Sequence, residues 1–275
     1  MSNSSPIGVF DSGIGGLSVW REIARQLPHE DTLYFADPIH IPYGPRSLEE
    51  IRAFSEAIAR FLLDRECKAI VVACNTASAA ALKDLRAAFP TIPFVGMEPA
   101  VKPAAETTRT RVVGVLATPA TFQGALFASV VERFANGVQL INQVCPGLVE
   151  QIEAGDLASP KTEAMLRGFL QPILDANADT IVLACTHYPF VIDSIRRIAG
   201  PGVSVIDPAP AIARQTSRVL AERGLSAPAS RAGRHRFFTS GDRDVFRHLL
   251  DRLALAGGEI EAAMWQNDRA LAAIE

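Results

Sequence analysis

Cysteine is scarce in this sequence. The 275 residues include four cysteines, Cys67, Cys74, Cys145 and Cys185, which lie far apart along the chain. Small secreted domains that depend on disulfides carry more cysteines at shorter spacings. The scarcity argues against a disulfide framework, and we expect free thiols in a reducing, cytoplasmic setting.

Long apolar runs and dense charge are absent as well. No run reaches the roughly 18 apolar residues that a membrane span needs, and residues 1–6 are polar, without the basic and apolar regions of a secretory signal. Basic and acidic residues number 27 and 30, which gives a formal net charge of −3. No basic run stands out, so we expect neither a membrane segment nor a nucleic-acid partner.

The composition is that of an ordinary globular protein, with 48% hydrophobic and 21% charged residues. At a prior of about 150 residues per domain, the length suits one large domain or two modest ones. Short apolar runs alternate with amphipathic segments along the whole chain. This alternation is typical of α/β proteins with parallel sheets.

The apolar runs predict strands at 7–10, 33–36, 69–73, 94–96, 112–116, 180–184, 203–206 and 236–239. The segments between them predict helices at 17–26, from Ser47 onward, and at 76–88, 122–135, 161–176, 188–199, 208–223 and 242–256. Ser47 and Glu50 have the spacing of a capping box at a helix start. Residues 226–235 are expected to form a surface loop.

Two of the predicted strands end in the same way. One segment reads Ala-Ile-Val-Val-Ala-Cys74-Asn75-Thr76, and the other reads Thr-Ile-Val-Leu-Ala-Cys185-Thr186-His187. Each is an apolar strand followed by Ala-Cys, small polar residues and a predicted helix. The likeness suggests two related halves.

The positions of Cys74 and Cys185 indicate a functional role for both thiols. Ligands of parallel α/β sheets bind beyond the carboxyl ends of the strands, where both cysteines fall. Each also precedes a predicted helix start, which lowers a thiol pKa below its free value of about 8.5 and favours the thiolate. We therefore predict two bases or nucleophiles, although buried structural thiols remain the alternative. Cys67 and Cys145 lack this setting and are interpreted as structural.

Metal and dinucleotide sites are weaker interpretations. Cys185 and His187 are two positions apart, but no Cys-x-x-Cys or His-x-x-x-His pair is present, so no metal is expected. Residues 13–18 match only part of G-x-G-x-x-G, and Asp11 would oppose a pyrophosphate there. The glycines more plausibly form a tight turn beside a polar ligand. Asp11 and Ser12 would then face that ligand, with Asp11 suited to an amino group.

Two thiols at one small site predict a specific reaction. One thiolate removes a proton from one face of a carbon, and the other thiol returns a proton to the opposite face. The configuration inverts without redox change, so no cofactor is required. The carbanion needs hydrogen-bond donors, which Asn75, Thr76 and Thr186 can supply near the cysteines.

The ordered motifs of the chain resemble the glutamate racemases, the cofactor-independent branch of the aspartate/glutamate racemases. The resemblance covers nearly the whole chain. It is carried by Ile7-Gly-Val-Phe-Asp11-Ser12-Gly-Ile-Gly-Gly, Pro42-Tyr43-Gly44, Ala73-Cys74-Asn75-Thr76-Ala77, Ala184-Cys185-Thr186-His187-Tyr188-Pro189, Asp207-Pro208-Ala209 and Thr239-Ser240-Gly241-Asp242.

The resemblance implies an α/β fold of two similar doubly wound parallel-sheet domains with the active site at their interface. Residues 1–97 plus 207–275 would form the first domain, and residues 98–206 the second. It implies interconversion of L- and D-glutamate, which supplies D-glutamate for peptidoglycan synthesis in the cytoplasm. Homodimers are common in the family, and glutamate would be the small-molecule partner.

The resemblance also assigns residues. It implies that Cys74 acts on D-glutamate and Cys185 on L-glutamate, with Asp11, His187 and Glu153 as helpers. The substrate contacts would come from Asp11-Ser12, Tyr43-Gly44, Asn75-Thr76 and Thr186-His187. Thr118 and Thr121 are expected to line the carboxylate pocket.

Two stretches depart from the family pattern. Pro38-Ile39 alters the loop that leads to Tyr43, and Pro119-Ala120 stands between the two threonines. The alternatives are an aspartate racemase, a cysteine hydrolase with Cys185 as nucleophile and His187 as base, or a binding module with buried thiols. Residues two apart at a strand-helix junction usually point apart, which counts against the hydrolase.

Overall fold

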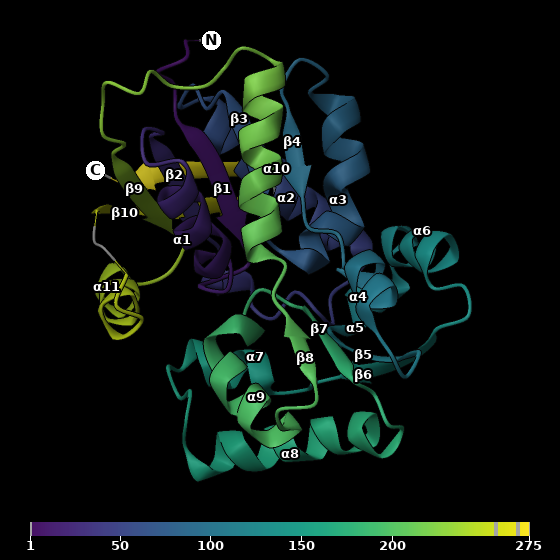
Figure 1. The fold of residues 1–275 in the computed structure, drawn as a ribbon. Helices are drawn as coiled ribbons and strands as arrows, with labels where there is room; N and C mark the ends of the chain where they lie inside the picture. Colours follow the sequence, from purple (N-terminus) through teal and green to yellow (C-terminus); the bar gives the residue numbers. More distant parts are fainter. Residues whose placement is uncertain (1, 256–257, 268–269, 275) are drawn as a thin grey trace.

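The structure is a computed structural model, and it describes residues 2–255, 258–267 and 270–274. Parts of the ranges predicted above, at residues 1, 256–257, 268–269 and 275, lie outside the described residues. Within the described residues the strands form one seven-stranded and one four-stranded sheet, which lie in separate lobes in Figure 1. In this part of the chain, no helix combines the length and the apolar character that crossing a membrane requires.

The larger sheet has the order β11-β10-β9-β2-β1-β3-β4. Its strand pairs are parallel except for β10 and β11, which are antiparallel. Its strands are β1 (Ile7–Asp11), β2 (Thr32–Ala36), β3 (Ala69–Val72), β4 (Phe94–Gly96), β9 (His235–Thr239), β10 (Glu259–Asn267) and β11 (Ala270–Ile274).

The smaller sheet has the order β6-β5-β7-β8, with all described pairs parallel. Its strands are β5 (Val112–Ala117), β6 (Gln139–Val144), β7 (Thr180–Ala184) and β8 (Ser204–Ile206). The order β6-β5-β7-β8 repeats the order β2-β1-β3-β4 of the larger sheet, and Cys185 follows β7 as Cys74 follows β3. The two similar cysteine segments therefore occupy equivalent places in two similar sheets.

Helices cover both faces of each sheet. They are α1 (Leu17–Gln26), α2 (Leu48–Leu63), α3 (Asn75–Ala88), α4 (Val101–Thr107), α5 (Pro119–Gln123), α6 (Ala125–Phe134), α7 (Leu148–Glu153), α8 (Pro160–Asp175), α9 (Ile192–Ala199), α10 (Ala209–Glu222) and α11 (Arg243–Arg252), with 3-10 turns η1 (Pro38–His40) and η2 (Tyr188–Val191). The capping box predicted at Ser47 and Glu50 opens α2.

Alternating side chains of β1 show how the sheet is packed. Ile7 and Val9 belong to a core shared with α1, α10 and α11, whereas Phe10 belongs to a core shared with α2 and α3. The smaller sheet packs against α8 and α9 on one face and against α4 and α6 on the other. The predicted α/β class with doubly wound parallel sheets is confirmed. The domain boundaries at 97/98 and 206/207 stay a prediction.

Several elements differ from the sequence expectation. The helix predicted at 122–135 is divided at Gly124 into α5 and α6, and the helix predicted at 188–199 begins with the short turn η2. The sequence did not predict β6, β10, β11, α4 or α7. Strand β6 was missed because it is an edge strand with exposed and half-exposed residues, and so lacks a continuous apolar run.

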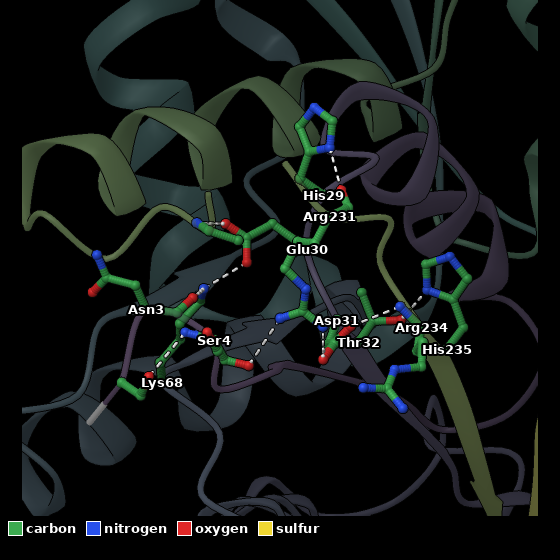
Figure 2. Close-up of polar contacts among 12 residues, drawn as sticks. Asn3, Ser4, His29, Glu30, Asp31, Thr32, Lys68, Arg231, Arg234 and His235 are labelled. Atoms are coloured by element: carbon green, nitrogen blue, oxygen red, sulfur yellow. Dashed lines mark hydrogen bonds and ion pairs between the residues drawn. The ribbon is translucent and has the colours of Figure 1, made fainter. Parts of the chain in front are cut away.

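The predicted surface loop 226–235 is tied to the amino end of the larger sheet by polar contacts (Figure 2). The Lys68 ammonium lies 2.5 Å from the Glu30 carboxylate, and both side chains are buried. Glu30 also accepts a hydrogen bond from the backbone of Ala227 at 2.7 Å. The Asp31 carboxylate forms an ion pair with the Arg231 guanidinium at 2.5 Å. Ion pairs and hydrogen bonds therefore hold the loop at the amino end of the sheet, opposite the carboxyl ends of its strands.

Candidate active site

A cavity of about 180 Å³ lies beside the carboxyl ends of β3, β5, β6 and β7. Both Cys74 and Cys185 line it, one from each sheet, and both are buried. The lining residues are Ser12, Pro42, Tyr43, Gly44, Pro45, Cys74, Asn75, Thr76, Thr118, Pro119, Val144, Cys145, Pro146, Gly147, Val149, Glu150, Cys185, Thr186 and His187. The cavity thus brings together the two thiols that the sequence placed at equivalent strand ends.

Cys74 is the N-cap residue of α3. The backbone N–H of Ala77 donates to its sulfur at 3.4 Å, and the thiol lies 3.8 Å from the Ser12 hydroxyl, to which it can donate. Burial raises the pKa of the Cys74 thiol well above its usual value, and the nearby Asp11 carboxylate raises it further. The predicted lowering of this pKa by the helix start is therefore wrong, because desolvation outweighs one capping hydrogen bond.

Cys185 has a different neighbour. Its sulfur lies 3.7 Å from Nδ1 of His187, whose Nε2 lies 2.6 Å from the Glu153 carboxylate. The expectation that residues 185 and 187 point apart is wrong, because the backbone curls after β7 into η2 rather than directly into a helix. Burial alone would lower the pKa of His187, but its contacts with Cys185 and Glu153 outweigh burial and hold it well above its usual value.

Asp11 is not among the residues that line the cavity, and the expectation that it faces the ligand stays a prediction. Its carboxylate accepts hydrogen bonds at 3.0 Å from the Thr186 hydroxyl and from the Gly13 backbone. Burial raises the pKa of Asp11, although the His187 charge and these hydrogen bonds oppose the shift. Asp11 therefore contacts the residue that follows Cys185, and it interacts electrostatically with Cys74.

The glycines after β1 allow this turn to pack closely against the lobe that holds the smaller sheet. A Cβ at Gly13 would overlap the Glu153 carboxylate, and one at Gly15 would overlap the His187 ring. The Ile14 backbone donates to Glu153 at 2.8 Å. This part of the chain is a tight turn, as predicted, and its missing side chains make room for the His187–Glu153 pair.

A chain of threonine hydroxyls lies between Cys74 and the end of β5. Thr76 Oγ1 is 2.9 Å from Thr118 Oγ1, which is 3.0 Å from Thr121 Oγ1. Thr76 and Thr118 line the cavity, whereas Thr121 lies behind them. A Cβ added at Gly44 would come within 3.1 Å of the Thr118 side chain, so the Tyr43-Gly44 segment closes against this chain.

The Asn75 side chain gives the clearest indication that the cavity can bind a polar ligand. Its side chain is 3% exposed, and neither its Oδ1 nor its Nδ2 has a hydrogen-bond partner among the described residues. Buried amide groups normally have partners, because leaving them unsatisfied costs about 1–3 kcal/mol. Since Asn75 lines the cavity, a polar ligand bound there would supply those partners.

Some lining residues were not predicted. Cys145, interpreted as structural, lines the cavity after β6, together with Pro146, Gly147, Val149 and Glu150. Their position at the carboxyl end of β6 would have indicated them, but β6 itself was not predicted. In the described parts of the chain, no group of three or more His, Cys, Asp or Glu side chains is placed to hold a metal ion.

The chain is similar to a known protein family over most of its length. The family model of the Asp/Glu/hydantoin racemases matches residues 7–216. The chain belongs to this family. It is accordingly a racemase, an isomerase.

Relatives of this racemase are similar over nearly their whole length. A glutamate racemase of Roseiflexus sp. (strain RS-1) is 54% identical over 96% of this chain and 98% of its own. A crystal structure of a glutamate racemase from Bacillus anthracis has a TM-score of 0.84 at 34% identity, covering 94% of this chain and 97% of its own. A Francisella tularensis glutamate racemase in complex with D-glutamate has a TM-score of 0.83 at 32% identity, with the same coverage.

Proposed function

We propose that this racemase interconverts L- and D-glutamate, with Cys74 and Cys185 as the two acid/base groups. The observation that carries the proposal is that two buried thiols, one from each sheet, line a single small cavity. The names of its relatives supply the substrate, since they are glutamate racemases and one is bound to D-glutamate.

In this mechanism the α-carbon of glutamate lies between the two sulfurs. With L-glutamate, the Cys185 thiolate removes the α-proton and Cys74 returns a proton to the other face. With D-glutamate the roles reverse, so each turnover leaves the protein with the opposite pair of protonation states. No atom of the protein changes oxidation state, and no cofactor enters the proton balance.

The two thiols have different surroundings, which suit them to different roles. Although burial alone would lower the pKa of His187, its contacts with Cys185 and Glu153 hold that pKa well above its usual value, so His187 can carry a positive charge beside the Cys185 sulfur. Cys74 starts as the neutral thiol, consistent with the upward shift of its pKa by burial. We assign the removal of the proton from L-glutamate to Cys185 and the delivery of a proton to the opposite face to Cys74, which Asp11 assists.

Hydrogen-bond donors at the cavity would hold the substrate and its carbanion. The Ser12, Thr76 and Thr186 hydroxyls and the unpartnered Asn75 amide all line the cavity. Donors fixed in a buried site stabilise developing charge more than water does, because they need no reorientation during the reaction. We assign the substrate carboxylates to this set. Tyr43, Gly44 and Thr118 would surround the side-chain carboxylate, and Thr121 would support Thr118 from behind.

We further propose that the product D-glutamate serves peptidoglycan synthesis, that the protein acts in the cytoplasm, and that it forms a homodimer. These proposals follow from the family resemblance. Size-exclusion chromatography with light scattering would test the homodimer, and a dependence of cell-wall integrity on the gene would test the role.

A second candidate deserves a test because Cys185, His187 and Glu153 form a contiguous set, as in cysteine hydrolases. Such a hydrolase would use Cys185 without Cys74. Incubation of L- or D-glutamate in deuterated water distinguishes the two functions. Two-thiol transfer should place deuterium on the α-carbon and convert each isomer to the other, whereas unlabelled and unconverted glutamate would overturn the proposal.

A further inference from the structure

The Asp37 carboxylate lies at the centre of a buried polar cluster next to the cavity. It is fully buried, and four side chains donate to it from three separate parts of the chain. Its Oδ2 accepts from the Tyr43 hydroxyl at 2.7 Å and from His40 Nδ1 at 2.9 Å. Its Oδ1 accepts from the Ser240 hydroxyl at 2.7 Å and from Trp265 Nε1 at 2.8 Å.

This cluster connects the cavity wall to the C-terminal hairpin. Tyr43 lines the cavity, whereas Trp265 belongs to β10, which pairs with β9 and β11 at the far side of the larger sheet. Trp265 also packs edge-on against the rings of His40, at 4.8 Å, and Phe54, at 5.7 Å. Asp37 is the one residue of the cluster that contacts both Tyr43 and Trp265 by hydrogen bonds among the described contacts.

A buried carboxylate is stable only when its oxygens are fully hydrogen-bonded, so its position is set by all of its donors together. Removing one donor lets the carboxylate relax toward the others. The Tyr43 hydroxyl would follow it, since that bond is the one described for the hydroxyl. The orientation of this part of the cavity wall therefore depends on a residue of the C-terminal hairpin.

We infer that Asp37 is a positioning residue for substrate binding, and that Trp265 acts through it on Tyr43. The inference rests on the proposed glutamate racemase function for its kinetic readout. It makes the C-terminal hairpin a functional part of the active site, although none of the hairpin's described residues lines the cavity.

The two tryptophans of the chain allow a matched comparison. Trp265→Phe keeps an aromatic ring and removes the bond to Asp37. Trp20→Phe makes the same change where Nε1 donates to Thr32 at 2.9 Å, away from the cavity lining. Trp265→Phe should raise the KM for glutamate about three- to tenfold and change kcat less than about twofold. Trp20→Phe should lower thermal stability and leave KM unchanged.

A double-mutant cycle shows whether the effect passes through Tyr43. In a Tyr43→Phe background the hydroxyl is already absent, so Trp265→Phe should raise KM no further. Independent, multiplying effects on KM would overturn the inference, as would equal KM changes in Trp265→Phe and Trp20→Phe. A wild-type protein without racemisation would instead count against the proposed function.

A measurement that needs no turnover tests the positioning role even if the wild-type protein does not racemise glutamate. Cys74 lines the same cavity as Tyr43, so a displaced wall should change its access to iodoacetamide. Mass spectrometry should find faster labelling of Cys74 in Trp265→Phe than in Trp20→Phe. Equal labelling rates in the two variants would contradict the positioning role whatever the substrate is.

Discussion

The Nε2 atom of His187 lies 2.6 Å from the Oε1 atom of Glu153, and the other ring nitrogen lies 3.7 Å from the Cys185 sulfur. The imidazole therefore bridges a carboxylate and a thiol in a buried setting. Glu153 also accepts the Ile14 backbone N–H, which fixes it against the turn after β1. Through His187, the Cys185 sulfur is thus connected to Glu153, a residue that does not line the cavity.

His187→Asn should lower kcat by about 10²- to 10³-fold and leave KM nearly unchanged, because a general acid/base partner of Cys185 is lost while the donors of the cavity remain. Racemisation rates in both directions, measured by circular dichroism, provide the check. His248→Asn, at an exposed histidine of α11, is the control and should retain activity. Equal activity of the two variants would remove His187 from the mechanism.

Glu153→Gln should change the pH dependence of kcat. The Glu153 carboxylate is one cause that raises the pKa of His187, so its replacement by an amide lowers that pKa. Activity that depends on protonated His187 is present below this pKa and lost above it. The high-pH limb of the kcat profile should therefore move to lower pH. An unshifted limb would show that His187 is not the group whose titration it reports.

Cys74→Ser and Cys185→Ser should each abolish turnover of both isomers, by about 10³-fold or more, since both groups take part in every passage and a hydroxyl is a far weaker base than a thiolate. Cys67→Ser provides the matched control, because this buried thiol lies outside the cavity lining. It should retain kcat. Full two-way racemisation by either cavity variant would refute the paired-thiol mechanism.

Gly13→Ala should lower kcat by about tenfold or more, because the added methyl group would overlap Glu153 and displace the His187–Glu153 pair. Gly168→Ala is the matched control. Its Cβ would meet no atom within 4 Å, and its helical position in α8 predicts a gain of about 0.5–1 kcal/mol in stability with full activity. Kinetics and urea unfolding of both variants test this, and an active Gly13→Ala enzyme would contradict it.

Lys68→Met should destabilise the fold by about 3–5 kcal/mol, because it leaves the buried Glu30 carboxylate without its cation. The double variant Lys68→Met with Glu30→Gln should recover part of the loss, since a neutral amide can still accept the Ala227 N–H. Urea unfolding measures both. Equal stability of the single and double variants would show that the pair is not coupled.

The apolar runs of the sequence were sufficient to predict the central strands. Buried parallel strands such as β3 and β7 are runs of Val, Ile, Leu and Ala, apart from Thr180 at the start of β7, and the cysteines at their ends could be placed from these runs alone. Edge elements carry a weaker pattern, so β6 was missed, and with it the position of Cys145 at the cavity. Functional residues at the end of a buried strand are thus easier to predict than those at the end of an exposed edge strand.

Properties that depend on the whole fold could not be predicted in the same way. The pKa of Cys74 is set by burial beneath residues far away in the sequence, which no local pattern records. Trp265 and Asp37 are separated by 228 positions, and their hydrogen bond requires the complete larger sheet. The glycines of residues 13–16 were predicted as a turn, but their close approach to Glu153 and His187 depends on how the two lobes pack.

The repeated strand order has a consequence for handedness. Because β3 and β7 hold the same rank in their sheets, the backbones of the two halves bring Cys74 and Cys185 to the cavity in similar ways. The two thiols still differ in their side-chain neighbours, with His187 beside one sulfur and Ser12 beside the other. Under the proposed two-thiol transfer, exchanging such neighbours would change kcat for one enantiomer only with a compensating change in its KM, because the equilibrium stays at equal amounts of both.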